Sequence, residues 1–178
     1  VRTGVSVIFP KAKSSSSFTV PAGIFVFNGN GEVTGLSQIE EAGVLEGPIG
    51  LTGTFSVGLV SQALRKWMRQ KYPKLEHSDI FMGLPVVAET YDGFLNNINV
   101  EALKEEHVFE ALAAAAPNNA LEGDIGGGSG MMSFAFKSGI GSASRVVECG
   151  GKNFTLGAMV QSNFGKREDL RILGRHLG

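Results

Sequence analysis

One stretch, Leu84–Asn99 (LPVVAETYDGFLNNIN), constrains the fold more than any other part of the sequence. It begins with a short apolar run behind a proline, Pro85–Ala88, which predicts a buried strand. The dipeptide Asp92–Gly93 then predicts a tight turn. Between the two lies the polar triplet Glu89–Tyr91, where the strand reaches the surface. A rigid strand end suits a catalytic or binding side chain, although a tyrosine that caps the core through its hydroxyl is the simpler alternative.

Composition excludes several classes of function. The chain has 178 residues, enough for one domain with a core, and we treat 1–178 as a portion of a single domain. Its 16 basic and 17 acidic residues give no electrostatic reason to expect nucleic acid or an anionic membrane as a partner. No apolar run reaches the roughly 18 residues that span a bilayer. No signal peptide is recognisable and Val1 is not an initiator, so we expect a cytoplasmic protein, or a periplasmic one if a leader was removed.

Cysteine and histidine usage argues against metal sites. The single cysteine, Cys149, can form neither an internal disulfide nor a thiolate cluster. The three histidines lack the spacing of metal ligands. We therefore expect no metal and no cofactor.

The remaining periodicities indicate alternating strands and helices. Apolar residues at helical spacing predict three helices, which are Ser37–Gly43, a segment from its N-cap Ser56 to Pro73, and Glu105–Ala116. Further strands are predicted at Val1–Pro10, Phe18–Asn28, Pro48–Thr54, from Met132 onward and at Phe154–Asn163. We expect the apolar run within Phe18–Asn28 to be buried on both faces, and Phe154–Asn163 to be a central strand with a polar end. Long apolar strands need cover on both faces, which favours an α/β architecture.

The 25 glycines are clustered rather than repetitive, which indicates tight backbone packing. Asn28–Gly35 (NGNGEVTG) predicts a hairpin or a strand-to-helix turn. Glu122–Met132 (EGDIGGGSGMM) lacks both the lysine of a phosphate loop and the GxGxxG pattern. We expect this segment to bring backbone close to a substrate or to another strand.

Five blocks in this order resemble the L-aminopeptidase/D-esterase family, also known as the β-peptidyl aminopeptidases. They are NGNGEVTG, ETYDG with LNNIN, GGGSGM, FKSGIGSASR and VQSNFGKR. The similarity covers nearly the whole chain. Members are self-processing hydrolases that fold as a four-layer αββα sandwich, similar to N-terminal-nucleophile hydrolases but with different connectivity. The resemblance therefore implies an α/β fold of this kind.

The resemblance also implies a chemistry. The family's precursor cleaves itself in front of a Ser or Thr, whose free α-amine then activates its own hydroxyl. The tetrahedral intermediate needs hydrogen-bond donors, and the matching residues here are the hydroxyl of Tyr91 and the side-chain amide of Asn163. We predict that Glu89 binds the substrate's ammonium group, with a structural carboxylate held by backbone donors or by Arg145 as the alternative. The remaining expected substrate contacts are Met82, Gly127 and Gly128.

No residue here matches the family's nucleophile. The resemblance thus implies that this is the larger chain, or part of it, and that a smaller chain from the same precursor carries the nucleophile. We expect that the segment does not fold or work as an independent monomer, and that two-chain units assemble into a tetramer. Many relatives carry Asn at the position of Gly53 and often His at that of Phe55, which leaves the substrate preference open.

The function implied is an aminopeptidase-type amidase or esterase that releases N-terminal residues from short peptides, amides or esters. Two alternatives use the same scaffold: a nylon-oligomer-type endo-amidase, and an acyltransferase that passes the acyl group to an amine. A third alternative is a non-catalytic assembly or binding subunit, which the missing nucleophile favours.

Overall fold

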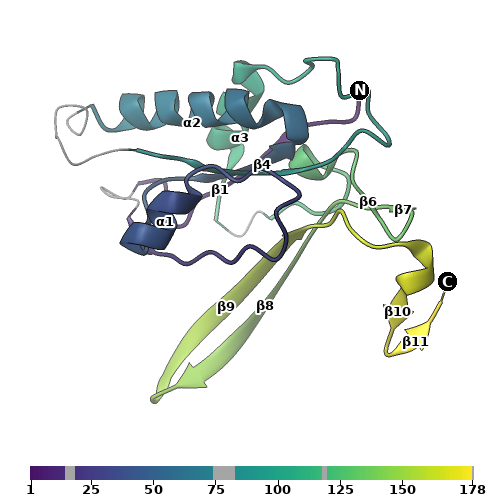
Figure 1. Ribbon diagram of the computed structural model, residues 1–178. Coiled ribbons are helices and arrows are strands. Elements are labelled where there is room, and N and C mark those ends of the chain that lie inside the picture. The colour runs from purple at the N-terminus through teal and green to yellow at the C-terminus, as the bar shows by residue number, and fades with distance from the viewer. Residues whose placement is uncertain (15–18, 74–82, 118–119, 178) are drawn as a thin grey trace.

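A computed structural model of the chain describes residues 1–14, 19–73, 83–117 and 120–177 (Figure 1). The helices are α1 (Leu36–Ala42), α2 (Val57–Lys71) and α3 (Glu105–Ala114), with short 3-10 helices η1 (Thr54–Ser56), η2 (Gly126–Gly128) and η3 (Arg167–Asp169). The strands in the first half are β1 (Val5–Ile8), β2 (Val20–Pro21), β3 (Val44–Leu45), β4 (Ile49–Gly53) and β5 (Val86–Thr90). Those in the second half are β6 (Met132–Ser133), β7 (Phe136–Lys137), β8 (Ile140–Cys149), β9 (Lys152–Gln161), β10 (Arg171–Ile172) and β11 (Arg175–His176). No helix in these ranges combines the length and apolar character needed to cross a bilayer.

A three-stranded sheet in the order β1-β4-β5 forms the centre of the body. β1 runs antiparallel to β4, and β4 runs parallel to β5, with Gly53 opposite Thr90 in the register. The carboxyl ends of β4 and β5 therefore lie at the same edge of the sheet. This edge carries the polar residues that the sequence singled out.

Helices α2 and α3 cover one face of this sheet (Figure 1). Their core includes the fully buried residues Val60, Leu64, Val87, Val108 and Leu112. The helix predicted between Ser56 and Pro73 is confirmed as α2, and its apolar stripe packs into this core, where Met68 is 1% exposed and Trp67 packs against the cluster.

Helix α1 packs with β2 and β3 near the other face, around Ile39, Leu45 and Val86. The helix predicted at Ser37–Gly43 is confirmed, but it begins one residue earlier, at Leu36, so Ser37 lies inside the helix and is not its N-cap. Gly35, with φ of 73°, precedes the helix and provides no side-chain cap. Gly43 ends it as predicted, in the left-handed conformation, and donates its N–H to the carbonyl of Ile39 at 2.9 Å.

The predicted strand Phe18–Asn28 is wrong beyond its start. Within it the structure describes only β2, and Phe25 and Phe27 are 84% and 91% exposed. Within the apolar run Ile24–Phe27, only Ile24 packs against the cluster formed by Ile39, Leu45 and Val86. A continuous apolar run forms a strand buried on both faces only where both faces are covered, and no described element covers this one.

Two further strand predictions need correction. The strand expected from Met132 turns back on itself, since Phe134 and Ala135 have φ of 51° and 56° and connect β6 to β7 as a small hairpin. The strand at Phe154–Asn163 exists as β9, but it is not central in the described chain. It pairs with β8 in a two-stranded arm that projects from the body (Figure 1).

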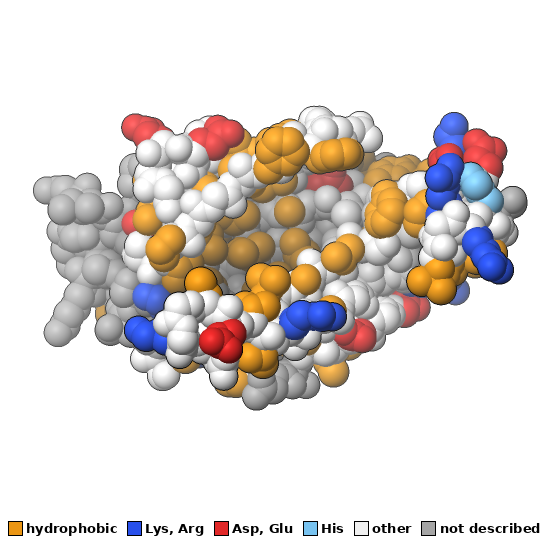
Figure 2. All heavy atoms as spheres, turned by 90° about the horizontal axis from the view of Figure 1, so that it is seen from below, with side chains coloured by type: hydrophobic (Ala, Val, Ile, Leu, Met, Phe, Trp, Pro, Cys, Tyr) orange, Lys and Arg blue, Asp and Glu red, His pale blue; other side chains and the backbone are white. Residues whose placement is uncertain are grey.

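The side of the body opposite α2 is hollowed. Seen from below, hydrophobic side chains gather around a depression in the middle of this face (Figure 2). Charged side chains gather instead at the end formed by the last residues of the chain, where β10 and β11 lie. Apolar side chains are therefore exposed in two places, around this depression and along the β8–β9 arm.

Candidate active site

Tyr91 follows β5 directly and lies at the carboxyl edge of the central sheet. Its side chain is 44% exposed, and its ring meets the edge of Phe94 at a centroid distance of 5.4 Å. The hydroxyl of Tyr91 lies so close to Gly93 that a Cβ atom at position 93 would collide with it. The phenol is therefore held on one side and accessible on the other, as a hydrogen-bond donor to a ligand must be.

The turn after Tyr91 is fixed by Asp92. Its carbonyl accepts from the N–H groups of Leu95 and Asn96 at 3.1 and 3.0 Å. Its carboxylate is 1% exposed and accepts from the amide of Asn96 at 3.3 Å, while Oδ1 has no partner among the described residues. The sequence predicted a turn here, which is confirmed, but it did not predict that this carboxylate is buried.

Glu89 is half-buried and bonded through both carboxylate oxygens. One accepts from the hydroxyl of Thr54 at 2.5 Å, and the other from the N–H of Glu32 at 3.3 Å. The backbone N–H of Glu89 also donates to the carbonyl of Glu32 at 3.3 Å. Glu89 thus attaches the predicted turn segment Asn28–Gly35 to the sheet edge, with a hydroxyl and a backbone donor as partners rather than Arg145.

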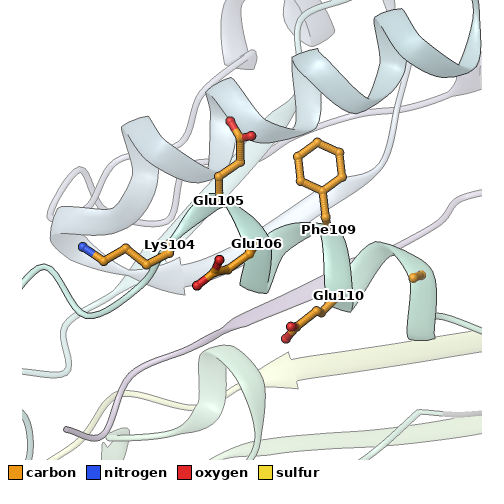
Figure 3. A pocket seen from close by; sticks show the side chains of 6 residues that line it. Lys104, Glu105, Glu106, Phe109 and Glu110 are labelled. Atoms are coloured by element: carbon orange, nitrogen blue, oxygen red, sulfur yellow. The ribbon is translucent and has the colours of Figure 1, made fainter.

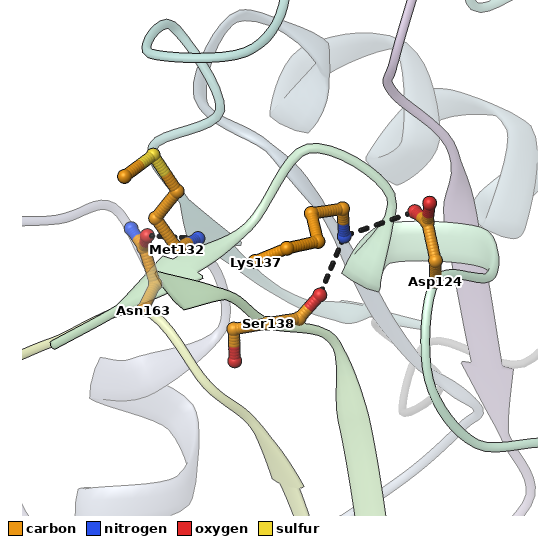
Figure 4. Close-up of polar contacts among 5 residues, drawn as sticks. All are labelled: Asp124, Met132, Lys137, Ser138 and Asn163. Carbon is orange, nitrogen blue, oxygen red and sulfur yellow. Dashed lines mark hydrogen bonds and ion pairs between the residues drawn. The ribbon is translucent and has the colours of Figure 1, made fainter. Parts of the chain in front are cut away.

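Asn163 lies two residues beyond β9 and is half-buried. Its side-chain oxygen accepts from the backbone N–H of Met132 at 3.4 Å (Figure 4). Since the carbonyl oxygen of the amide faces the body, its NH₂ group faces away from that contact and is available as a donor. Beside it, Lys137 forms an ion pair with Asp124 at 3.0 Å and donates to the carbonyl of Ser138 at 2.5 Å (Figure 4).

A hydrogen bond between side chains brings the two polar strand ends together. The amide of Gln161, the last residue of β9, donates to the hydroxyl of Thr90, the last residue of β5, at 2.6 Å. Tyr91 follows Thr90, and Asn163 lies two residues beyond Gln161. These two segments, about 70 positions apart in sequence, therefore meet at one edge of the body.

The glycine segment packs under this junction. Gly127 and Gly128 are buried in η2, and a Cβ on Gly127 would overlap both the side chain of Gln161 and the carbonyl of Leu51. The N–H of Gly127 donates to the hydroxyl of Ser6 at 3.1 Å. This confirms close approach to another strand, whereas a contact of Gly127 and Gly128 with substrate stays a prediction. Met82 lies outside the described residues.

No described group of three or more His, Cys, Asp or Glu side chains is arranged to hold a metal ion. A concave surface along α3 is a different feature, lined by Lys104, Glu105, Glu106, Phe109, Glu110 and Ala113 (Figure 3). It lies on a single helix and contains none of the residues at the strand ends. The strand ends therefore remain the better candidate site, with neutral donors from Tyr91 and Asn163 and one carboxylate from Glu89.

The sequence profile of peptidase family S58 matches residues 1–178. The chain belongs to peptidase family S58. The beta-peptidyl aminopeptidase BapA of Sphingosinicella xenopeptidilytica is 47% identical over 177 residues, which make up 99% of this chain and 43% of that protein. The predicted family resemblance is thereby confirmed.

Two solved structures resemble this S58 chain closely. The L-aminopeptidase D-Ala-esterase/amidase of Ochrobactrum anthropi has a TM-score of 0.80 at 41% identity, over 99% of this chain and 44% of that one. It is described as a prototype for the serine aminopeptidases and a new variant of the Ntn hydrolase fold. A Burkholderia sp. beta-aminopeptidase has a TM-score of 0.88 at 45% identity, over 99% and 49% of the two chains. The predicted α/β fold of Ntn-hydrolase type is confirmed, and this S58 chain spans about half the length of these relatives.

Sequence reasoning missed the contacts that support the candidate residues. The bond between Thr90 and Gln161 and the bond from Met132 to Asn163 both join distant segments, so no local pattern signals them. No motif in the sequence singles out Ser133. Its hydroxyl in fact contacts the segment around Asn163.

Proposed function

We propose that this S58 chain is the larger chain of a two-chain amidase or esterase of the aminopeptidase type, which releases N-terminal residues from short peptides, amides or esters. The nucleophile is a Ser or Thr that begins a smaller chain cut from the same precursor. The length of the relatives supports this division, because this chain covers 43% to 49% of them. The apolar surface of the β8–β9 arm gives the smaller chain a surface to cover, and a tetramer of such units is the assembly we expect.

The observation that carries the site assignment is the orientation of Asn163. Met132 engages its side-chain oxygen at 3.4 Å, which leaves the NH₂ group as the outward donor. The bond from Gln161 to Thr90 holds this segment beside the one that bears Tyr91. Two neutral donors on neighbouring segments suit an oxyanion, because their hydrogen bonds stabilise its developing charge more than they stabilise the ground-state carbonyl.

The reaction follows from these groups. The hydroxyl of the smaller chain's first residue attacks the substrate carbonyl, and its proton passes to that residue's own α-amine. Tyr91 and Asn163 donate to the oxyanion, which then collapses and expels the amine or alcohol with a proton. Water attacks the resulting ester in the same way, which frees the N-terminal residue as an acid and restores the hydroxyl.

The first test removes one donor at a time in the full-length protein. Tyr91→Phe and Asn163→Ala should each lower kcat by about 10²–10³, with little change in KM or assembly. Asn153→Ala, at an exposed position of β9, is the matched control and should leave kcat unchanged. Self-processing passes through a similar tetrahedral species, so uncut precursor should also accumulate. If both variants mature and turn over substrate within a few-fold of the wild type, the two residues are structural and the assignment is wrong.

A second test concerns Glu89 as the ligand of the substrate's ammonium group. A carboxylate with two fixed hydrogen bonds is oriented in advance for a cationic ligand. Glu89→Gln should raise KM for amine-bearing substrates much more than for acyl substrates that lack the amine. Thr54→Val removes only the neighbouring hydroxyl and tests whether the orientation matters. If Glu89→Gln raises KM equally for both substrate classes, Glu89 holds the loop around Glu32 and does not bind the ammonium group.

A further inference from the structure

The hairpin β6–β7 has an unusual turn for its sequence. Phe134 and Ala135 both have positive φ, 51° and 56°, although neither is a glycine. Left-handed backbone costs an L-residue roughly 1–2 kcal/mol, so such a turn persists only where its surroundings hold it. The surroundings here are the residues that follow β9, which include Asn163.

Contacts on both sides of the turn connect it to that segment. The N–H of Phe134 donates to the carbonyl of Phe164 at 2.9 Å, and the two rings meet edge to face at 5.2 Å. Arg167 donates to the carbonyl of Ala135 at 2.8 Å and lies over the ring of Phe136 at 3.3 Å. The turn and the end of β9 therefore form one bonded unit.

Within this unit, the hydroxyl of Ser133 holds the residues on both sides of Asn163. It accepts from the N–H of Phe164 at 3.2 Å and lies 2.6 Å from the hydroxyl of Ser162. A serine hydroxyl can donate one bond and accept two, so it can make both contacts at once. One side chain thus contacts the residue before Asn163 through its hydroxyl and the residue after Asn163 through its backbone N–H.

The bond from Met132 to Asn163 is too weak to fix the position of the Asn163 amide by itself. Its 3.4 Å length is beyond the usual range for N–H···O bonds, so it sets which way the amide faces but holds it loosely. The position of the NH₂ group then depends on the backbone on either side. Ser133 contacts both neighbours of Asn163, beside the backbone bonds from Ser162 to Gly139 and from Phe134 to Phe164.

We propose that Ser133 is a positioning residue for the amide of Asn163, a role that rests on the proposed function of Asn163 as an oxyanion donor. Without the hydroxyl, the N–H of Phe164 loses its acceptor at an exposed residue, while the bond from Phe134 to the carbonyl of Phe164 remains, so we expect the fold to lose little. The amide of Asn163 then shifts relative to the reacting carbonyl. Misplacement of a catalytic group by about 1 Å can lower a rate by about 100-fold.

The experiment uses the full-length, processed protein and a substrate that it hydrolyses. Ser133→Ala should lower kcat by about 10- to 100-fold with KM nearly unchanged, because only the oxyanion interaction is affected. Ser133→Thr keeps the hydroxyl and should recover most of the loss. Ser144→Ala, at an exposed position of β8, is the matched control and should behave as the wild type.

A double-mutant cycle separates a positioning role from a structural one. If Ser133 acts through Asn163, Ser133→Ala should lower the rate of an Asn163→Ala enzyme by less than about threefold. Full additivity would overturn the inference, as would Ser133→Ala within threefold of the wild type while Asn163→Ala loses 100-fold. In both of those cases the proposed function still stands. If Asn163→Ala itself is neutral, both the inference and the proposed site are wrong.

Discussion

The body and the β8–β9 arm contain similar apolar residues in opposite surroundings. In the body, Leu64 and Val87 are fully buried between α2, α3 and the central sheet. In the arm, Leu156 and Phe154 are 65% and 53% exposed, and Ile140 is the one buried residue of its strands. Both regions have regularly paired strands, and ten pairs of residues face each other along the arm. Regular pairing alone therefore does not produce a core, and a two-stranded ribbon is marginally stable without one.

The arm is not uniformly apolar, and its register shows which side lacks cover. Paired residues point to the same face, so Val147 and Phe154 share a face with Leu156 and Val160. The opposite face carries more polar residues, such as Ser142 and Thr155. The apolar face is the one that we expect another segment of the protein to cover.

The largest expected effect comes from a matched pair of leucines. In the complete two-chain protein, Leu64→Ala should lower the free energy of unfolding by about 2–5 kcal/mol, because it opens a cavity in the core. If the smaller chain covers the arm, Leu156→Ala should lower the free energy of unfolding by a similar amount. Leu156 would then be buried in the complete protein, as Leu64 is in the body. Urea unfolding of both variants, followed with the same probe, measures the two values.

Thr155→Ala, on the more polar face, is the control for that pair and should change the free energy of unfolding by less than about 0.5 kcal/mol. A similarly small value for Leu156→Ala would mean that the arm stays exposed in the complete protein. The proposed contact with the smaller chain would then be wrong.

The same contrast explains what the sequence could predict. The apolar stripe of α2 was predicted correctly because its spacing is local and its partners lie in the same chain. The run that contains Phe25 and Phe27 was misread, because its pattern does not say whether anything covers it. The turn at Phe134 and Ala135 was missed since neither residue is a usual turn former.

The candidate site was predicted in part and for a different reason. Tyr91 and Asn163 were named from their matches to family blocks, and the polar strand ends made them plausible as donors. Their environment depends on bonds such as that from Gln161 to Thr90, which joins residues 71 positions apart. No periodicity or spacing carries such information, so only the folded chain reveals it.

The next largest effect on stability is expected from Thr90→Val, at the junction between the body and the arm. Thr90→Val removes the acceptor of the Gln161 amide, whose own oxygen has no partner among the described residues. Leaving a buried amide unsatisfied should cost about 1–3 kcal/mol, and kcat should fall as the two donor segments loosen. Thr155→Val makes the same change of side chain at an exposed position of the arm, and it is the control for Thr90→Val. Unchanged stability and kcat would mean that the junction is held by backbone contacts alone.

The smallest expected effect concerns Glu122 at the base of the arm. The hydroxyl and the N–H of Ser142 both donate to its carboxylate, at 2.6 and 2.7 Å, and they lower the pKa of Glu122 below its ordinary value. A lowered pKa in the folded state means that the contact stabilises the arm above the unfolded pKa of about 4.3. This stabilisation is lost as the pH falls through the folded pKa, so the contact between Ser142 and Glu122 should weaken only in acid, while the backbone pairing of Gly123 with Ile140 persists.

Side-chain NMR titration of Glu122 tests this prediction, with Ser142→Ala as the variant and Ser144→Ala as the control. Ser142→Ala removes the hydroxyl, the larger of the two contributions, and should raise the pKa of Glu122 toward its ordinary value. The remaining N–H should keep the pKa slightly low, because a hydrogen bond to the charged form still favours that form. Since Glu122 is fully exposed, solvent screens the interaction and the change in overall stability should be too small to detect. If Ser142→Ala leaves the pKa where it was, the base of the arm is held by its backbone pairing, such as that between Gly123 and Ile140, and the arm is attached independently of pH.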